Sequence, residues 1–274
     1  MKHPVNMAYE AATADLNDVN MIDPFHLEAY GETTVNYNRD VEIFPVLNAI
    51  FEQILGESPY KSPTDMGVNM AGNCDDSCRE AANQEIIRRY YHCLCELKRG
   101  NSSKDILYKL QLLMKQAGLT INDRPVVKAA MQREEETGHP AVAIELSDGT
   151  LVTGKTSDLL GAASACLLNS LKVLEDIDHE VHLVSPQAIE PIQTLKTSYL
   201  GSINPRLHTD EILIALSISA ATDKRAALAL SALRQLKGCE VHSSVMLSSV
   251  DEAVFKKLGM HLTCEPKTES DNQQ

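Results

Sequence analysis

The chain has 274 residues, of which 43% are hydrophobic, so it can build a sizeable core and is not disordered for most of its length. Its net charge of −13 argues against nucleic acid and membrane surfaces as partners, because both are recognised by clustered Lys and Arg. The odd count of seven cysteines and the lack of a signal-peptide pattern fit a reducing compartment, so we expect a cytoplasmic protein.

The N-terminal half of the sequence indicates loops followed by helices. Residues 1–40 mix apolar and polar side chains densely, and we interpret them as the remnant of a preceding domain. A helical subdomain is predicted over 41–138, because apolar residues recur there at helical spacing and a glycine follows each of the four helices. Its predicted helices are Val41–Leu55, Asp76–Arg99, Lys104–Ala117 and Asp123–Thr137, with Asp123 as the N-cap of the last.

From Ala141 onward the pattern changes to strands that alternate with helices. Two strand-like runs flank Asp148-Gly149, a strong hairpin signal. Further strands are predicted at Val181–Val184, Glu240–Leu247 and His261–Cys264, and helices at Leu159–Leu174, Pro186–Leu200, Ala226–Leu236 and Val250–Leu258. The fold class is therefore α/β. Over 139–266 we predict a three-layer α/β sandwich that resembles the cytidine-deaminase topology, followed by a flexible tail over 267–274.

Metal chemistry is disfavoured by the residues at the helix starts. A zinc deaminase needs His or Cys ligands there, whereas the corresponding positions read Thr156-Ser157-Asp158 and Ser248-Ser249. Cys93 and Cys95 face different sides of one predicted helix, so they cannot share an ion easily. We therefore expect no metal site, and we expect Cys166 and Cys239 to be core residues.

Seven segments together resemble one family. They are His3–Asn6, Ala8–Leu16, Asp18–His26, Tyr37–Asp40, Ser62–Met70, Gly154–Ser157 and Asn204–Glu211. The chain resembles the bacterial uncharacterised protein family 0371, also called domain of unknown function 1846, in its C-terminal part only. The resemblance implies a fragment of a larger nucleotide-binding enzyme, with residues 1–40 left from the nucleotide-binding-like domain. The phosphate loop Gly-x-x-x-x-Gly-Lys-Ser/Thr of such a domain is absent from this sequence.

The richest candidate site is the segment around His208. Arg206 can grip a carboxylate or phosphate, and His208 can act as an acid or base near neutral pH, with Asp210 beside it. An equally weighted reading is a loop entering a helix, with Thr209 or Asp210 as its cap and Arg206 in a structural ion pair.

A second candidate is Lys155-Thr156-Ser157, which we interpret as an anion-binding turn at a helix N-terminus. The competing reading, which we favour, is a strand-to-helix turn capped by Thr156 or Ser157.

Two further pairs of polar residues are candidates for ligand binding. Asp65 and Asn69 lie in a loop and can bind a substrate hydroxyl or metal, although a rigid turn with nothing bound is slightly favoured. Asp23 and His26 belong to a site shared with the preceding domain, or are structural, which is the reading we favour.

Two functions remain open from the sequence. The chain is either part of an enzyme that acts on a nucleotide or phosphorylated small molecule, or a non-catalytic oligomeric scaffold or small-ligand binding module. The first predicts that Arg206, His208, Lys155 and Asp65 gather at one cleft, and the second predicts that they scatter. Either way we expect a homo-oligomer, and the cofactor and the reaction stay undetermined.

Overall fold

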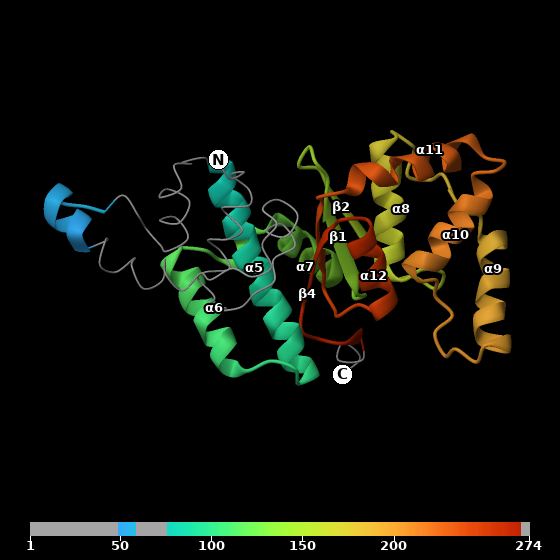
Figure 1. Ribbon diagram of the computed structural model, residues 1–274. Helices are drawn as coiled ribbons and strands as arrows, with labels where there is room; N and C mark the ends of the chain where they lie inside the picture. Colours follow the sequence, from blue (N-terminus) through green and yellow to red (C-terminus); the bar gives the residue numbers. More distant parts are fainter. Residues whose placement is uncertain (1–48, 59–75, 270–274) are drawn as a thin grey trace, which may run out of the picture. The chain divides into compact units, whose positions relative to one another are not determined.

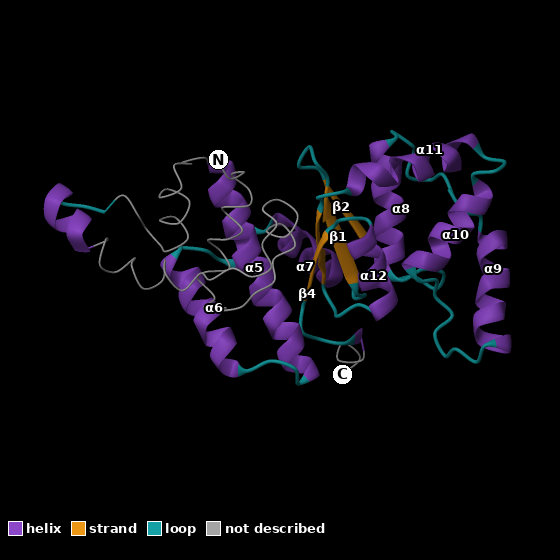
Figure 2. Ribbon diagram, viewed as in Figure 1, coloured by secondary structure: helices purple, strands orange, loops and turns teal. Residues whose placement is uncertain are grey.

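The computed structural model describes residues 49–58 and 76–269 and divides the chain into two compact units, Met1–Asp123 and Arg124–Gln274 (Figure 1). The first unit is helical where it is described, and the second holds the sheet (Figure 2). The sheet unit begins at Arg124, whereas the sequence pattern placed this boundary at 138–139.

The first unit contains two long helices that pack against each other. α5 (Asp76–Arg99) confirms the predicted helix residue for residue, and α6 (Lys104–Gln116) nearly does. Residues 49–55 form a further helical segment within the predicted Val41–Leu55 helix, whose beginning lies outside the described residues. A short 3-10 turn, η1 (Ile121–Asp123), ends the unit.

The helix that opens the second unit, α7 (Pro125–Thr137), starts differently from our prediction. Its N-cap is Arg124, and Pro125 occupies the first helical turn, where its missing N–H costs no hydrogen bond. The expected capping role of Asp123 is therefore wrong. The Asp123 carboxylate accepts hydrogen bonds from the backbone N–H and the hydroxyl of Thr120 instead.

The rest of the second unit alternates strands and helices. Its elements in chain order are β1 (Ala141–Glu145), β2 (Leu151–Lys155), α8 (Ala162–Leu174), α9 (Pro186–Thr194), the π-helical turn η2 (Leu195–Tyr199), α10 (Thr209–Ser219), α11 (Lys224–Ala232), the 3-10 turn η3 (Leu233–Leu236), β3 (Glu240–Ser243), α12 (Ser249–Lys257) and β4 (His261–Cys264). The predicted hairpin is confirmed as β1 and β2, joined by a turn in which Gly149 has a φ of +84°.

The four strands form one mixed sheet in the order β2-β1-β3-β4. β1 runs antiparallel to both of its neighbours, and β3 and β4 are parallel. It follows that β2, β3 and β4 point the same way, so their carboxyl ends meet at one edge of the sheet. In sheets with parallel strands this edge is where ligands usually bind.

Helices cover both faces of the sheet, because alternate residues of β1 point to opposite sides. Val142 and Ile144 belong to the large core formed with α8, α10, α11 and α12, whereas Ala143 packs with Val126 and Ala130 of α7. This confirms an α/β class with helices on both faces of a sheet.

The resemblance to the cytidine-deaminase topology is not confirmed. The predicted strand at Val181–Val184 does not form. Leu183 and Val184 are buried in the core without pairing to the sheet, so their apolar character reflects packing between helices. The predicted strand Glu240–Leu247 is also shorter, since β3 ends at Ser243.

Candidate functional site

Three helices begin near the edge where β2, β3 and β4 end. α8 follows β2 and has Gly161 as its N-cap, α12 follows β3 and has Ser248 as its N-cap, and α10 has His208. The starts of α8 and α10 are joined directly, because Gly161 N–H donates to the carbonyl of Leu207 at 3.3 Å. Helix N-termini carry free N–H groups and a partial positive charge, so this edge favours anions.

At this edge the ring of His208 is held by the carboxylate of Asp251. His208 Nδ1 lies 2.9 Å from Asp251 Oδ2. The same carboxylate accepts from Thr209, through its backbone N–H at 2.8 Å and its hydroxyl at 2.9 Å, and from the Ser248 hydroxyl at 2.7 Å. Asp251 is thus fixed on both oxygens while its partner's side chain keeps 31% of its surface exposed. This is an oriented Asp–His pair that links α10 to α12.

The two groups of this pair shift each other's pKa in opposite directions. The hydrogen bond that His208 donates to the Asp251 carboxylate raises the pKa of His208 above its ordinary value, although partial burial opposes the change. Burial alone would raise the pKa of Asp251, but its bonds with His208, Thr209 and Ser248 outweigh that effect and hold the pKa below its ordinary value. The charged pair is therefore the favoured state at mildly acidic pH.

A buried lysine supports the backbone on the other side of His208. Lys196 lies in the π-helical turn η2 and donates from Nζ to the carbonyl of Arg206 at 2.6 Å and to Glu211 Oε2 at 2.8 Å. Glu211 Oε2 also accepts from the backbone N–H of His208 at 2.8 Å. Single π-helical turns are common at functional sites. Here the turn places an ammonium group one hydrogen-bonded step from the histidine.

The other two predicted catalytic residues lie close to His208 in sequence but do not join its network. Arg206 forms an ion pair with Glu269 at 2.5 Å, near the surface, and its backbone N–H is held by Asn204. Asp210 is exposed and accepts from the N–H of Glu211. The ion pair of Arg206 is of the kind that the structural interpretation predicted. The predicted cap at Thr209 or Asp210 is wrong, because His208 is the N-cap of α10.

Lys155, Thr156 and Ser157 form a turn that precedes α8 but does not cap it. Lys155 is the last residue of β2, and Thr156 is buried with its N–H on the carbonyl of Pro140 at 2.9 Å. The Ser157 hydroxyl accepts from Leu160 N–H at 3.1 Å and closes the turn. The predicted capping role of Thr156 or Ser157 is wrong, because Gly161 is the N-cap.

The remaining predicted ligand-binding residues, Asp23, His26, Asp65 and Asn69, lie outside the described residues, so they stay predictions. Over the two described ranges, no group of His, Cys, Asp and Glu side chains could hold a metal ion. Cys93, Cys95, Cys166 and Cys239 are buried, and burial raises the pKa of the Cys166 thiol. Cys166 and Cys239 belong to the core, as expected.

Sequence reasoning missed the partners of His208. Asp251 lies 43 residues further along the chain, and no local pattern connects the two. One signal does exist at Ser248-x-x-Asp251, a Ser followed three residues later by an acid, which typically marks a helix start. It predicts the cap that Ser248 provides to the N–H of Asp251, but not the contact with α10.

The stability of the Asp251–His208 pair should depend on pH in a defined window. The raised pKa of His208 contributes stability that is complete below the unfolded value of 6.5 and is lost as pH rises through the folded value. The lowered pKa of Asp251 contributes stability that is present above 3.8 and is lost as pH falls. We expect Asp251→Asn to lower the free energy of unfolding most between these two pH values, by about 1.5–3 kcal/mol.

Urea unfolding of the original chain and of Asp251→Asn at a series of pH values measures this difference. The loss should shrink toward alkaline pH, where His208 is neutral in both chains. A loss that stays constant from mildly acidic to alkaline pH would show that His208 does not carry the effect. Ser217→Ala, on the exposed side of α10, provides a control that should show no such trend.

The fold and the site define a mixed α/β protein with a histidine oriented by a carboxylate at the carboxyl edge of its sheet. Within the described ranges no helix is long and apolar enough to cross a membrane. Two family models match the sequence, the N-terminal domain of unknown function DUF1846 over residues 1–118 and its C-terminal counterpart over residues 122–273.

Named relatives agree with these models. The chain is 58% identical over 270 residues to a UPF0371 protein of Corynebacterium diphtheriae, and 54% identical over 269 residues to one of Streptococcus pyogenes serotype M5. Each comparison covers 97% of this chain and 54% of the relative, so the chain spans about half the length of these proteins. The chain belongs to the UPF0371 (DUF1846) family. Our expectation that it matches only the C-terminal part of the family is wrong, since residues 1–118 match the N-terminal model.

Proposed function

We propose that the second unit supplies the acid–base histidine of an enzyme that acts on a nucleotide or another phosphorylated small molecule. The observation that carries this proposal is the His208–Asp251 pair. In the part of the chain that the structure describes, the ring of His208 makes its hydrogen bonds through Nδ1, which leaves Nε2 to a substrate. A side chain that is 31% exposed, with its tautomer set by a fixed carboxylate, suits proton transfer.

The surroundings of His208 favour an anionic substrate. The pKa of His208 is raised by Asp251, so the positive imidazolium is more populated near neutral pH than in a free histidine. The N-termini of α8, α10 and α12 add partial positive charge at the same edge. Phosphate is the anion that such arrangements of N–H groups and cations commonly bind.

The chemical role follows from the arrangement of the pair. Asp251 accepts a hydrogen bond from Nδ1–H, so Nε2 can donate a proton to a leaving oxygen or, when neutral, take one from an attacking water. Positioned groups of this kind contribute about 10²- to 10⁴-fold to a rate.

An NMR titration of the His208 ring tests the proposal without knowledge of the substrate. We expect inorganic phosphate and adenosine monophosphate to bind and to raise the pKa of His208 further, because an added negative charge stabilises the imidazolium. Asp251→Asn should lower the starting pKa and weaken the binding. His179, which is exposed and distant in sequence from the site, is the internal control. A pKa of His208 that does not change at saturating phosphate would contradict the proposal.

A non-catalytic oligomeric scaffold is the second candidate, and one observation favours it. Exposed apolar side chains gather on η2, the loop after it and α10. They are Tyr199, Leu200, Ile203, Ile214 and Ile218, each at least 60% exposed. Such surfaces often mark contacts between proteins. A stable oligomer in sedimentation, together with no response of His208 to phosphate, would favour the scaffold over the enzyme.

A further inference from the structure

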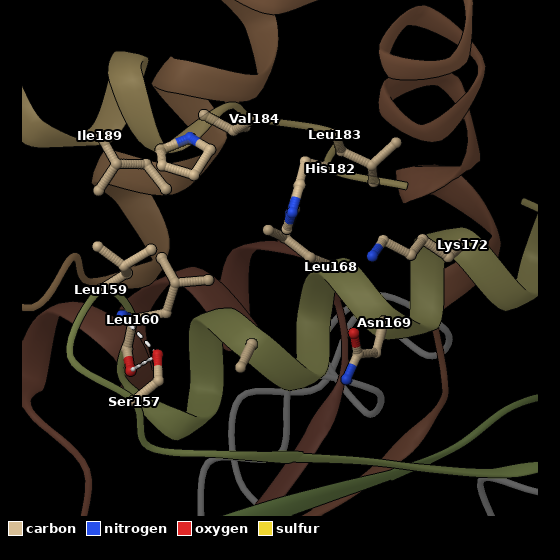
Figure 3. Close-up of a pocket in the computed structure, with 12 residues that line it drawn as sticks. Ser157, Leu159, Leu160, Leu168, Asn169, Lys172, His182, Leu183, Val184 and Ile189 are labelled. Atoms are coloured by element: carbon tan, nitrogen blue, oxygen red, sulfur yellow. Dashed lines mark hydrogen bonds between the residues drawn. The ribbon is translucent and has the colours of Figure 1, made fainter. Parts of the chain in front are cut away.

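A separate cavity of about 200 Å³ lies between α8 and the segment that leads into α9 (Figure 3). Its lining includes neither His208 nor Asp251. One wall is a single face of α8, formed by Ala165, Leu168, Asn169 and Lys172, whose spacing places them on neighbouring turns. The cavity is therefore a feature of the core helix and lies beyond the function proposed above.

Three of the four polar side chains that line the cavity gather at one end. Figure 3 shows Lys172, His182 and Asn169 together on one side, with the Lys172 amine pointing into the space that His182 faces. Lys172 Nζ donates one hydrogen bond, to the carbonyl of His179 at 2.8 Å, and an ammonium group has three protons to donate. Partial burial lowers the pKa of Lys172, and the nearby charges of Glu180 and Asp178 oppose this change. A cation with unused donors thus lines this end.

The other end of the cavity is mostly apolar, and its one polar side chain, Ser157, accepts the backbone N–H of Leu160. Leu159, Leu160 and Ile189 line it, opposite the polar group in Figure 3. Asn169 fixes the α8 wall, because its Nδ2 donates to the carbonyl of Thr153 in β2 at 2.9 Å. Gln193 of α9 holds the turn before α8, because its Nε2 donates a hydrogen bond to the carbonyl of Asp158 at 3.0 Å. The two ends therefore keep a fixed separation.

We propose that this cavity binds a short aliphatic carboxylate, with the carboxylate at the Lys172 ammonium and the chain among Leu159, Leu160 and Ile189. Charge and shape both support this occupant. The carboxylate of the ligand would pair with the Lys172 ammonium group. Burial of its short alkyl chain against leucine and isoleucine side chains is favourable, because it removes apolar surface from water. The volume corresponds to about seven water-sized groups of about 30 Å³ each, which matches a chain of the length of hexanoate.

Thermal-shift and NMR titrations of the full chain with hexanoate, hexanol and hexylammonium test the proposal. We expect saturable binding of hexanoate, weaker binding of hexanol and no binding of hexylammonium. Lys172→Gln should weaken hexanoate at least about tenfold, the loss expected for one hydrogen bond to a charged group, and leave hexanol within about twofold. Ala165→Leu, which fills the cavity from the α8 wall, should abolish both.

Lys256→Gln on α12 is the matched control, because Lys256 is an exposed lysine on another helix. It should leave all three affinities unchanged. The proposal is overturned if hexylammonium binds as well as hexanoate, if Lys172→Gln leaves hexanoate binding unchanged, or if none of acetate, butyrate, hexanoate and octanoate binds saturably. Circular dichroism identifies a misfolded variant. Lys172→Gln tests the charged end of the cavity and Ala165→Leu tests its α8 wall, so each variant keeps the proposal testable if the other misfolds.

Discussion

Replacing Gly154 with alanine should destabilise the second unit by about 3 kcal/mol or more. A Cβ at this position in β2 would lie 2.1 Å from the backbone nitrogen of Cys166, 2.5 Å from its Cα and 2.8 Å from the carbonyl carbon of Ala165. These atoms belong to the backbone of α8, so they cannot turn aside as a side chain can. α8 would have to move away from β2, and the packing of α8 on the sheet in the large core would be lost.

Gly161→Ala is the matched control, since the nearest atom to its Cβ is the carbonyl oxygen of Leu207 at 3.7 Å, an ordinary contact. We expect a loss of at most about 1 kcal/mol there, from the change at the N-cap of α8. Urea unfolding followed by circular dichroism measures both variants. A free energy of unfolding for Gly154→Ala within 1 kcal/mol of the original chain would contradict the close approach of α8 to β2.

Gly154 also bears on the segment Gly154-Lys155-Thr156-Ser157. We predicted an anion-binding turn there because free N–H groups and the helix dipole favour phosphate at a helix N-terminus. In the structure Gly154 is required by packing, because α8 crosses β2 so closely there that a Cβ would clash with the helix backbone. A single sequence does not separate these two uses of glycine, because both follow from the missing side chain and differ only in what approaches the backbone.

The helices could be predicted where apolar spacing and a following glycine agree, as for α5 and its stop at Gly100. The hairpin was predictable because Asp148-Gly149 supplies the left-handed turn residue. Val181–Val184 misled the prediction because a short apolar run has the same appearance in a strand and in a buried loop. Which of the two forms depends on α8 and α9 packing over Leu183 and Val184, and this is a long-range effect.

The candidate site shows the same limit. His208 could be proposed from its own segment, because a histidine beside Arg206 in a loop is a recognisable pattern. Its orienting partner could not, since Asp251 reaches it only after α10 and α12 pack together. Lys196 likewise reads as a surface lysine in sequence, yet it is 7% exposed because the π-helical turn directs it toward Glu211. Predicting such a site needs the pairing of distant helices.

Arg124→Ala should cost about 3–5 kcal/mol of the free energy of unfolding, which is the range for breaking a buried ion pair on one side. The Arg124 side chain is fully buried at the start of α7 and connects that helix to β3 and β4. It donates to the carbonyl of Val241 at 3.0 Å, the carbonyl of His261 at 2.8 Å and the Thr263 hydroxyl at 3.1 Å, and it pairs with the carboxylate of Glu240. Alanine removes all four donated bonds and leaves a cavity.

A double-mutant cycle separates the ion pair from the loss of packing. If the pair carries much of the effect, Glu240→Ala and the double variant should show a coupling of more than about 1 kcal/mol, because once Arg124 is gone the second change no longer breaks the pair. Arg234→Ala, at an exposed position in η3, should change stability by less than about 0.5 kcal/mol. Chemical denaturation measures the free energy of unfolding of the original chain, of the three variants of the cycle and of the control. Additive losses would show that the ion pair with Glu240 contributes little and that Arg124 acts through the carbonyl groups of β3 and β4.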